Sequence, residues 1–213
     1  MARERGRERR EAVMEAALGV IAERGLAATR ISDISERAGM SPGHVMYYFG
    51  SKDRVLMEAL RHVEDRMHEE AETELASIAP GPARLRRLLE LNLPDGFADP
   101  TWTLWLEAWS IAPHDGAIRD LVAELEGRWV SLLADVVRSG VDAGAFASDD
   151  VEAAVTHLYA AINGLAVQVV TGVGDLRAAE ALAACMQLAA AELNFEAGQR
   201  RASPRARSTV TRS

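Results

Sequence analysis

The stretch TRISDISERAGMSPGHVMYYFGSKD, residues 29–53, decides the fold of this chain. It holds two short helical patterns on either side of Gly39, a residue suited to a tight turn. Apolar residues recur at helical spacing in both patterns, as Ile31, Ile34 and Ala38 in the first and Val45 and Phe49 in the second. Ser41 and Pro42 mark the start of the second helix, because serine can accept a hydrogen bond from a free backbone N–H and proline has no N–H to lose. Two short helices joined by a glycine turn after a longer helix form a helix-turn-helix, which we predict here.

A helix that enters a DNA groove needs small or polar residues near its N-terminus, so that it can reach the base edges. The residues expected to face the groove are Ser41, Pro42, Gly43, His44 and Tyr47. The residues expected to flank it and contact phosphates are Thr29, Arg30, Tyr48 and Lys52. Lys52 carries an additional argument, since it is the only lysine among 24 basic residues and a compact cation there can hold a phosphate. The partner predicted from this surface is double-stranded DNA.

Helical periodicity continues through the rest of the chain, and strand-like alternation is scarce. The first amphipathic helix should end at Gly25. Further helices are predicted over about 52–77, 83–93, 101–112, 117–143, 150–171 and 176–196, with Thr101 and Asp149 as caps of two of them. The predicted fold is therefore all-α with about nine helices. We expect a three-helix DNA-binding domain at 1–53, a larger helical domain at 54–197 and a basic, disordered tail at 198–213.

Charge is unevenly distributed along the chain, whose total is −8. Residues 1–61 carry 11 basic against 9 acidic residues, residues 62–196 carry 8 against 23, and the tail from 197 carries 5 basic residues and no acidic one. The basic ends favour an anionic partner. The acidic middle either favours a cationic partner or serves only to keep the protein soluble.

Membrane insertion and secretion are not expected from the sequence. The apolar stretch 158–170 is interrupted by Asn163, Gly164 and Gln168 and is too short to span a bilayer. The Arg-rich N-terminus lacks the apolar core of a signal peptide. A single cysteine, Cys185, is compatible with a reducing compartment, so we expect a cytoplasmic protein.

The motifs of common enzyme classes are also missing from the sequence. It contains no Gly-x-Ser-x-Gly elbow, no Walker loop and no zinc-helix motif. The histidines show no ligand spacing and are His44, His62, His68, His114 and His157. We therefore expect neither an enzyme nor a metal or cofactor site.

Three of the four tryptophans lie along one face of the predicted helix at 101–112. Trp102, Trp105 and Trp109 are spaced i, i+3 and i+7. The rings either pack in the core or line a pocket in which indole faces hold a cation, each contact contributing about 0.5 to 2 kcal/mol.

Three other residues are further ligand-binding candidates. Glu107 is on the same helix, although its helical angle places it away from the tryptophans. Tyr159 and Asn163 share a face of the helix at 150–171, and an amide on an apolar face needs a hydrogen-bonding partner from protein or ligand.

The first 60 residues resemble the TetR family of transcriptional regulators. The residues that match its pattern are Thr29, Ile34, Ala38, Gly39, Met40, Ser41, Gly43, Tyr48, Phe49, Ser51, Lys52 and Asp53. The departures are Arg30, where many relatives carry a second Thr, Ser35, where they carry Ala, and Met46, where they carry a phosphate-contacting Tyr. The resemblance implies a ligand-responsive regulator, with repression favoured over activation, that binds a palindromic operator. A helical scaffold without DNA binding is the alternative, and the capped recognition helix argues against it.

The same resemblance implies a homodimer in which the last two helices of each chain pair across a two-fold axis. The residues predicted at this contact are His157, Ala161, Gly164 and Gln168 on one helix and Leu182, Met186, Ala189 and Leu193 on the other. Small residues such as Ala161 and Gly164 permit close approach of helices. The apolar stripe of the last helix has an alternative place in the protein's own core.

The segment WTLWLEAW, residues 102–109, is similar to the corresponding helix of the TetR branch that contains the choline-pathway regulators. Together with the acidic middle, this similarity favours a small organic cation, such as a polyamine or a quaternary amine, as effector. A flat hydrophobic compound is the alternative. Effector binding is expected to tilt the helix at 52–77 and change the separation of the two recognition helices, which lowers operator affinity.

Overall fold

The computed structural model describes residues 2–196, and in that range it contains nine α-helices, one 3-10 turn and no strand. The elements are α1 (Ala2–Arg24), α2 (Ile31–Arg37), α3 (Pro42–Phe49), α4 (Lys52–Ala76), α5 (Pro82–Asn92), α6 (Pro100–Ile111), α7 (Gly116–Asp142), α8 (Val151–Thr171), η1 (Val173–Asp175) and α9 (Ala178–Glu192). The all-α prediction is confirmed. The predicted tail at 198–213 lies outside the described residues.

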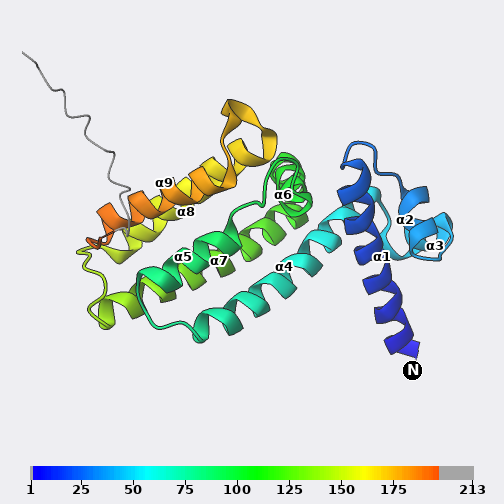
Figure 1. Cartoon of the computed structure of the whole chain (residues 1–213). Coiled ribbons are helices and arrows are strands. Elements are labelled where there is room, and N and C mark those ends of the chain that lie inside the picture. The colour runs from blue at the N-terminus through cyan, green and yellow to red at the C-terminus, as the bar shows by residue number, and fades with distance from the viewer. Residues whose placement is uncertain (1, 197–213) are drawn as a thin grey trace, which may run out of the picture.

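The helices form two groups that the long helix α4 joins (Figure 1). The first group contains α1, α2 and α3, and α4 runs from it into the second group, which contains α5 to α9. Helix α4 contributes Leu60 to an apolar cluster near the first group and, at its C-terminal end, Leu75 to a second cluster. A movement of α4 therefore affects both groups.

Turn and cap chemistry shapes the first group as the sequence predicts. α1 ends at Arg24 because Gly25 adopts a positive φ of 76°. Gly39 in the turn between α2 and α3 has a φ of 65°. The Ser41 hydroxyl accepts a hydrogen bond from the backbone N–H of His44 at 3.2 Å and so caps α3.

A small core holds the helix-turn-helix to its supporting helix. Ile34 of α2 and Val45 of α3 are fully buried. They pack in one cluster with Val13 and Ala17 of α1 and with Val55 at the start of α4. The orientation of α3 is therefore fixed from both sides.

Two larger apolar clusters hold the second group together. The cluster nearer the first group lies among α4, α6 and the beginning of α7, and includes Leu56, Leu60, Leu104, Leu121 and Leu125. The other lies among α5, the second half of α7, α8 and α9, and includes Leu85, Leu89, Leu133, Leu158 and Leu193.

Helix α8 is long and apolar enough to cross a membrane by length and composition alone. Its apolar residues Leu158, Ile162 and Ala166 are instead buried in the second of these clusters. Packing of a core helix accounts for this composition.

Two predicted helix caps are wrong by one or two residues. The cap of α6 is Asp99 rather than Thr101, since its carboxylate accepts from the backbone N–H of Trp102 at 3.0 Å. The cap of α8 is Asp150 rather than Asp149, and it accepts from the N–H of Ala153 at 2.9 Å. In both cases the aspartate directly before the helix reaches the free N–H groups of the first turn.

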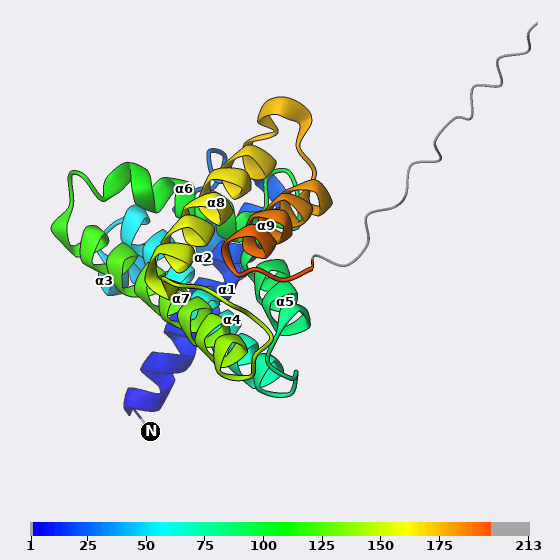
Figure 2. The ribbon, with the colours of Figure 1, turned by 90° about the vertical axis from the view of Figure 1, so that its left-hand side faces the viewer.

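The apolar stripe of α9 faces the protein's own core, which corrects one part of the predicted dimer contact. Helices α8 and α9 lie side by side along one side of the second group (Figures 1 and 2). Met186, Ala189 and Leu193 are buried in the cluster that α9 shares with α5 and α8, and Leu182 is half-buried at its edge. Met186, Ala189 and Leu193 are therefore not available to a second copy.

Substitution by alanine at two glycines of α7 is expected to change stability in opposite directions. A Cβ atom at Gly140 would lie 2.2 Å from Cδ2 of Phe146, whereas nothing lies within 4 Å of a Cβ atom at Gly127. We expect Gly140→Ala to lower the free energy of unfolding by about 1 to 3 kcal/mol through overpacking. We expect Gly127→Ala to raise it by about 0.5 to 1 kcal/mol. Urea unfolding of both variants measures these changes, and shifts of the same sign would contradict the packing of Phe146 on α7.

Candidate effector pocket and DNA-binding surface

The exposed face of α3 carries most residues predicted to contact DNA. Ser41, Pro42, Gly43 and His44 are exposed around its first turn, and Tyr47 exposes 82% of its surface. The rings of His44 and Tyr48 stack with their centroids 5.6 Å apart, and the ring of Tyr47 meets that of Tyr48 edge-on. The small residues leave the N-terminus of α3 accessible, and the aromatic side chains stand beside it.

The positions predicted to flank the groove differ in how accessible they are. Arg30 is exposed directly before α2, and Lys52 is a half-buried residue in the first position of α4. Thr29 is only 2% exposed, and its hydroxyl donates a hydrogen bond to the Gly25 carbonyl oxygen at 2.8 Å. A phosphate contact by the Thr29 side chain does not fit this burial. Thr29 instead fixes the turn between α1 and α2.

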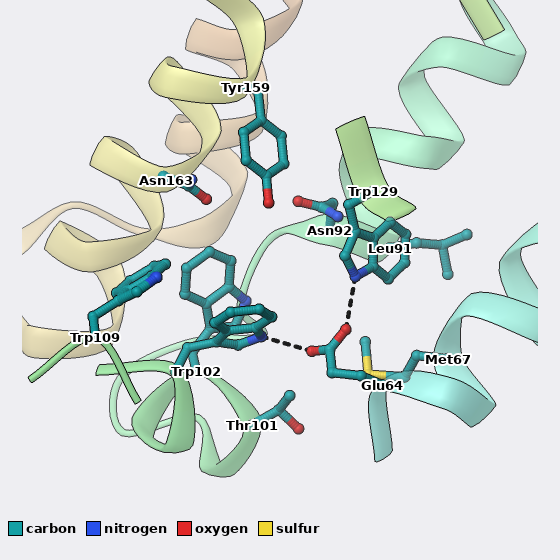
Figure 3. A pocket seen from close by; sticks show the side chains of 11 residues that line it. Glu64, Met67, Leu91, Asn92, Thr101, Trp102, Trp109, Trp129, Tyr159 and Asn163 are labelled. Atoms are coloured by element: carbon teal, nitrogen blue, oxygen red, sulfur yellow. Dashed lines mark hydrogen bonds between the residues drawn. The ribbon is translucent and has the colours of Figure 1, made fainter. Parts of the chain in front are cut away.

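A pocket in the second group of helices is enclosed by all four tryptophans of the chain (Figure 3). It is lined by Glu64, Met67, Leu91, Asn92, Thr101, Trp102, Trp105, Trp109, Trp129, Tyr159 and Asn163. The Trp109 ring centroid lies 6.0 Å from that of Trp102 and 5.6 Å from that of Trp105. The α6 tryptophans therefore have both of the places that the sequence left open, the core and a pocket wall. Trp105 is buried in the core, and all three rings of α6 line the pocket.

Glu64 of α4 places a carboxylate among these rings. Its side chain is nearly inaccessible, with 3% of the residue exposed. Oε1 accepts a hydrogen bond from the Trp105 indole N–H at 2.6 Å, and Oε2 accepts one from the Trp129 indole N–H at 2.7 Å (Figure 3). A carboxylate has about four acceptor positions, so the two indole donors leave room for further interaction.

Burial raises the pKa of Glu64 above its ordinary value, because an ionised carboxylate loses hydration in the interior. The hydrogen bonds from Trp129 and Trp105 act in the opposite direction, and the positive charge of Arg128 adds to them. The surroundings of Glu64 therefore stabilise its ionised form only in part. A cation placed against Glu64 would stabilise the ionised form.

Neutral polar groups lie elsewhere around the pocket, contributed by Asn92, Thr101, Tyr159 and Asn163. In Figure 3 the Tyr159 hydroxyl and the Asn92 amide point into the space between the tryptophans. Burial is the main cause that raises the pKa of Tyr159, so its hydroxyl is neutral at ordinary pH. Among the residues lining this pocket, no Lys, Arg or His is present and Glu64 is the one carboxylate.

The structure separates Glu107 from the tryptophans. Glu107 lies in a different cleft, between α6 and the start of α4, together with Lys52. Side chains two positions apart on an α-helix point in directions that differ by about 200°. Glu107 therefore points away from the pocket that Trp105 lines. Contrary to the prediction, Glu107 therefore does not line the same pocket as the tryptophans.

Sequence analysis missed Glu64 and Trp129. A signal for Glu64 exists, because it follows Leu60 and Val63 in the apolar register of α4, where an acidic residue needs a partner. Trp129 is buried in the middle of α7 and gives no comparable signal. Its relation to α6 depends on how the two helices pack.

The pocket is narrow in this structure. Its open volume is about 20 Å³, which is room for about one water molecule. A ligand with several heavy atoms therefore requires its walls to move. Trp102, Trp109 and Met67 are only half-buried, so side chains free to adjust lie on the α6 and α4 walls.

A helix-turn-helix with an accessible recognition helix, joined by α4 to a helical domain with an aromatic pocket, defines a ligand-responsive DNA-binding regulator. Residues 13–59 match the family described as bacterial regulatory proteins of the tetR family. Residues 81–194 match the BetI-type transcriptional repressor C-terminal domain. The chain belongs to the TetR family of transcriptional regulators, in the group with a BetI-type repressor domain. This is a family of regulators, not of enzymes.

Curated relatives carry the same designation. The HTH-type transcriptional regulator BetI of Rhizobium meliloti (strain 1021) is 30% identical over 161 residues, which are 75% of this chain and 77% of that protein. BetI of Burkholderia thailandensis is 34% identical over 115 residues, 53% of this chain and 59% of that protein. The second match thus spans little more than half of each protein.

Solved structures share the fold over most of its length. A transcriptional regulator from Saccharomonospora viridis, crystallised in complex with choline, has a TM-score of 0.75 and 34% identity, covering 84% of this chain and 94% of that one. A TetR-family regulator from Rhodococcus sp. has a TM-score of 0.68 and 26% identity, covering 87% of this chain and 98% of that one.

Proposed function

We propose that this protein is a cytoplasmic repressor that binds a palindromic operator as a homodimer and is released from it by choline or a closely related quaternary ammonium alcohol. The observation that carries the effector proposal is the Glu64 carboxylate, buried among four indole rings. A flat hydrophobic effector, the alternative from the sequence, would leave the remaining acceptor positions of this buried carboxylate without a partner.

The head group of such an effector suits this wall better than a primary ammonium does. A primary ammonium has three N–H donors that all need acceptors when buried. A trimethylammonium group has no donors, and its charge is attracted to ring faces by about 0.5 to 2 kcal/mol per contact. The pocket offers four rings and one carboxylate, so a methylated cation matches its composition and a polyamine does not.

The opposite end of the effector is best a hydroxyl group. The Tyr159 hydroxyl and the amides of Asn92 and Asn163 can each donate to or accept from an alcohol. A carboxylate at that place would find no Lys, Arg or His among the lining residues and would be repelled by Glu64. The related structure that contains choline is consistent with this choice.

The homodimer proposal rests on the outer face of α8. His157, Gly164 and Gln168 are exposed there, and Ala161 is half-buried beside them. The partner face on α9 is formed by the exposed residues Ala183, Gln187 and Ala191, which replace the buried stripe predicted from the sequence. Two recognition helices held about 34 Å apart would then read the two halves of the operator.

The dimer contact is tested by Gly164→Arg. Nothing lies within 4 Å of a Cβ atom at Gly164 within the chain, so the fold should tolerate the change. An arginine between two closely packed helices should prevent association and shift the mass in solution from dimer to monomer, with operator affinity lost as a result. Light scattering coupled to size exclusion measures the mass. Gly127→Arg, at an equally open position on α7, is the control and should remain dimeric.

A gel-shift titration tests the proposed function as a whole. The purified dimer is incubated at moderate salt with the DNA flanking its own gene, and choline, glycine betaine and spermidine are added in separate series. Choline should dissociate the complex at concentrations at which the other two leave it intact. No specific complex with this DNA would sink the repressor proposal, and release by spermidine alone would sink the choice of effector.

The affinity for choline should rise with pH and level off above the pKa of Glu64. Burial raises this pKa above 4.5, so at low pH choline must displace a proton from the free protein. For the same reason, the free energy of unfolding of the choline-free protein should fall as pH rises from about 4.5 through the pKa of Glu64 in the folded state. Bound choline should prevent this fall, because it stabilises the ionised carboxylate. Calorimetric titration from about pH 5 to 8 in buffers of different ionisation enthalpy measures affinity and proton release. Constant affinity without proton release would contradict direct pairing with Glu64.

A further inference from the structure

A second cleft separates α6 from the DNA-binding group of helices. It has a volume of about 450 Å³ and is lined by Ile21, Gly25, Leu26, Ala27, Lys52, Asp53, Leu56, Ala98, Thr103 and Glu107. Its walls are the end of α1 with the turn that follows, the first residues of α4, the loop before α6 and α6 itself. The cleft thus adjoins the part of the DNA-binding domain from which Lys52 is expected to reach a phosphate.

Helix α6 forms a wall of both cavities. Trp102, Trp105 and Trp109 line the effector pocket, and Thr103 and Glu107 line the cleft. Any rotation or shift of α6 that changes one cavity therefore changes the other.

The walls of the effector pocket differ in what lies behind them. Trp129 and Tyr159 belong to or pack against the larger apolar cluster of α5, α7, α8 and α9. Behind α6 lies the open cleft. Since the pocket holds only about one water molecule and closely packed interiors resist compression, α6 is the wall with room to yield when a ligand enters.

Two opposite charges line the cleft and have no partner in the part of the chain that the structure describes. Within residues 2–196, neither the Lys52 ammonium nor the Glu107 carboxylate forms an ion pair or a side-chain hydrogen bond, and both side chains are half-buried. Asp53 also lines the cleft, but it is next to Lys52 on α4, so its position relative to Lys52 does not depend on α6.

We propose that Glu107 is the positioning residue that couples the effector pocket to DNA. This inference rests on the proposed function. When the effector moves α6 toward the cleft, the Glu107 carboxylate approaches Lys52 and pairs with its ammonium, which is then no longer available to a DNA phosphate. The effector and the operator compete in this way for one cation without sharing a binding site. Effector binding thus lowers operator affinity through Lys52, the only lysine of the chain.

The test compares four variants by operator affinity with and without saturating choline, and by calorimetric binding of choline to the free protein. They are Glu107→Gln, Glu107→Asp, Lys52→Gln and the double variant Glu107→Gln/Lys52→Gln. Asp120→Asn is the control, because Asp120 is an exposed acid of α7 outside both cavities and without an ion pair in the described part of the chain.

Glu107→Gln should bind choline to the free protein no more than about 3-fold more weakly than the wild type, because the lost ion pair belongs to the choline-bound state. The choline-induced drop in operator affinity should become about 3- to 10-fold smaller, the size expected for one ion pair in each protomer. Glu107→Asp keeps the charge and should restore most of the response, and Asp120→Asn should respond fully. Lys52→Gln should bind the operator more weakly. In the Lys52→Gln background Glu107→Gln should have no further effect on the response.

Two failures are distinguishable. If the wild type shows no response to choline, the proposed function is wrong and the coupling falls with it. If the wild type responds and Glu107→Gln responds equally, or if the two substitutions act additively, the coupling alone is overturned.

Discussion

Replacing Glu64 with glutamine is expected to weaken choline binding by about 100- to 4000-fold. Removing one partner of a buried charge pair costs about 3 to 5 kcal/mol, and each 1.4 kcal/mol corresponds to about a factor of ten in affinity. Glutamine has nearly the shape of glutamate, so the walls of the pocket keep their places. Its NH2 group, however, must face either the Trp105 or the Trp129 indole N–H, both of which now donate to the carboxylate.

Calorimetric titration with choline measures this loss, and two further readings separate it from damage to the fold. Glu64→Gln should bind the operator normally without choline. Its free energy of unfolding near neutral pH should fall by no more than about 1 to 3 kcal/mol, the cost of one unpaired indole N–H, which removal of the buried charge offsets in part. Glu107→Gln is the matched control, because the same substitution outside the pocket should leave choline affinity within about 3-fold of the wild type. Near-normal choline affinity in Glu64→Gln would show that the carboxylate does not face the ligand.

Gly43→Glu is expected to abolish specific operator binding, with at least about a 100-fold loss of affinity. Gly43 is exposed in the first turn of α3, and nothing lies within 4 Å of a Cβ atom built there. A carboxylate at this point of the recognition helix would meet the negative potential of the groove and its phosphates, which a DNA-binding protein must neutralise rather than repeat. An acidic residue at a helix N-terminus is otherwise favourable, so the fold should not suffer.

The control for this variant is Gly127→Glu, which adds the same charge at an open helical position on α7. It should bind the operator about as well as the wild type. Fluorescence anisotropy of labelled operator DNA measures both variants, and circular dichroism checks their helix content. Retention of specific binding by Gly43→Glu would mean that α3 does not enter the groove.

The DNA-binding end could be predicted in detail because its signals are local. The glycine turn, the Ser41 cap and the spacing of Ile34, Val45 and Phe49 all fall within 25 consecutive positions. Thr29 shows the limit of this approach. A family pattern identifies its position, but its burial beneath the end of α1 follows from tertiary packing.

The effector pocket could be predicted only in part because its walls come from distant segments. The spacing of the α6 tryptophans indicates one face, and this face does line the pocket. The carboxylate that they surround is on α4, and the fourth ring is 65 positions farther along the chain on α7. Periodicity shows which face of a helix is apolar and not what covers it. For that reason the stripe of Met186 and Leu193 could not be assigned to the core or to a dimer from the sequence.

The gathering of every tryptophan around a single pocket also makes the protein its own optical probe. No indole elsewhere contributes a constant background, so the tryptophan emission of the chain originates entirely from this pocket. Three of the rings have neighbouring centroids 5.6 and 6.0 Å apart, close enough for their electronic transitions to interact. Entry of a colourless, non-fluorescent cation should therefore be visible in the emission spectrum and in the near-ultraviolet dichroism of the unlabelled protein.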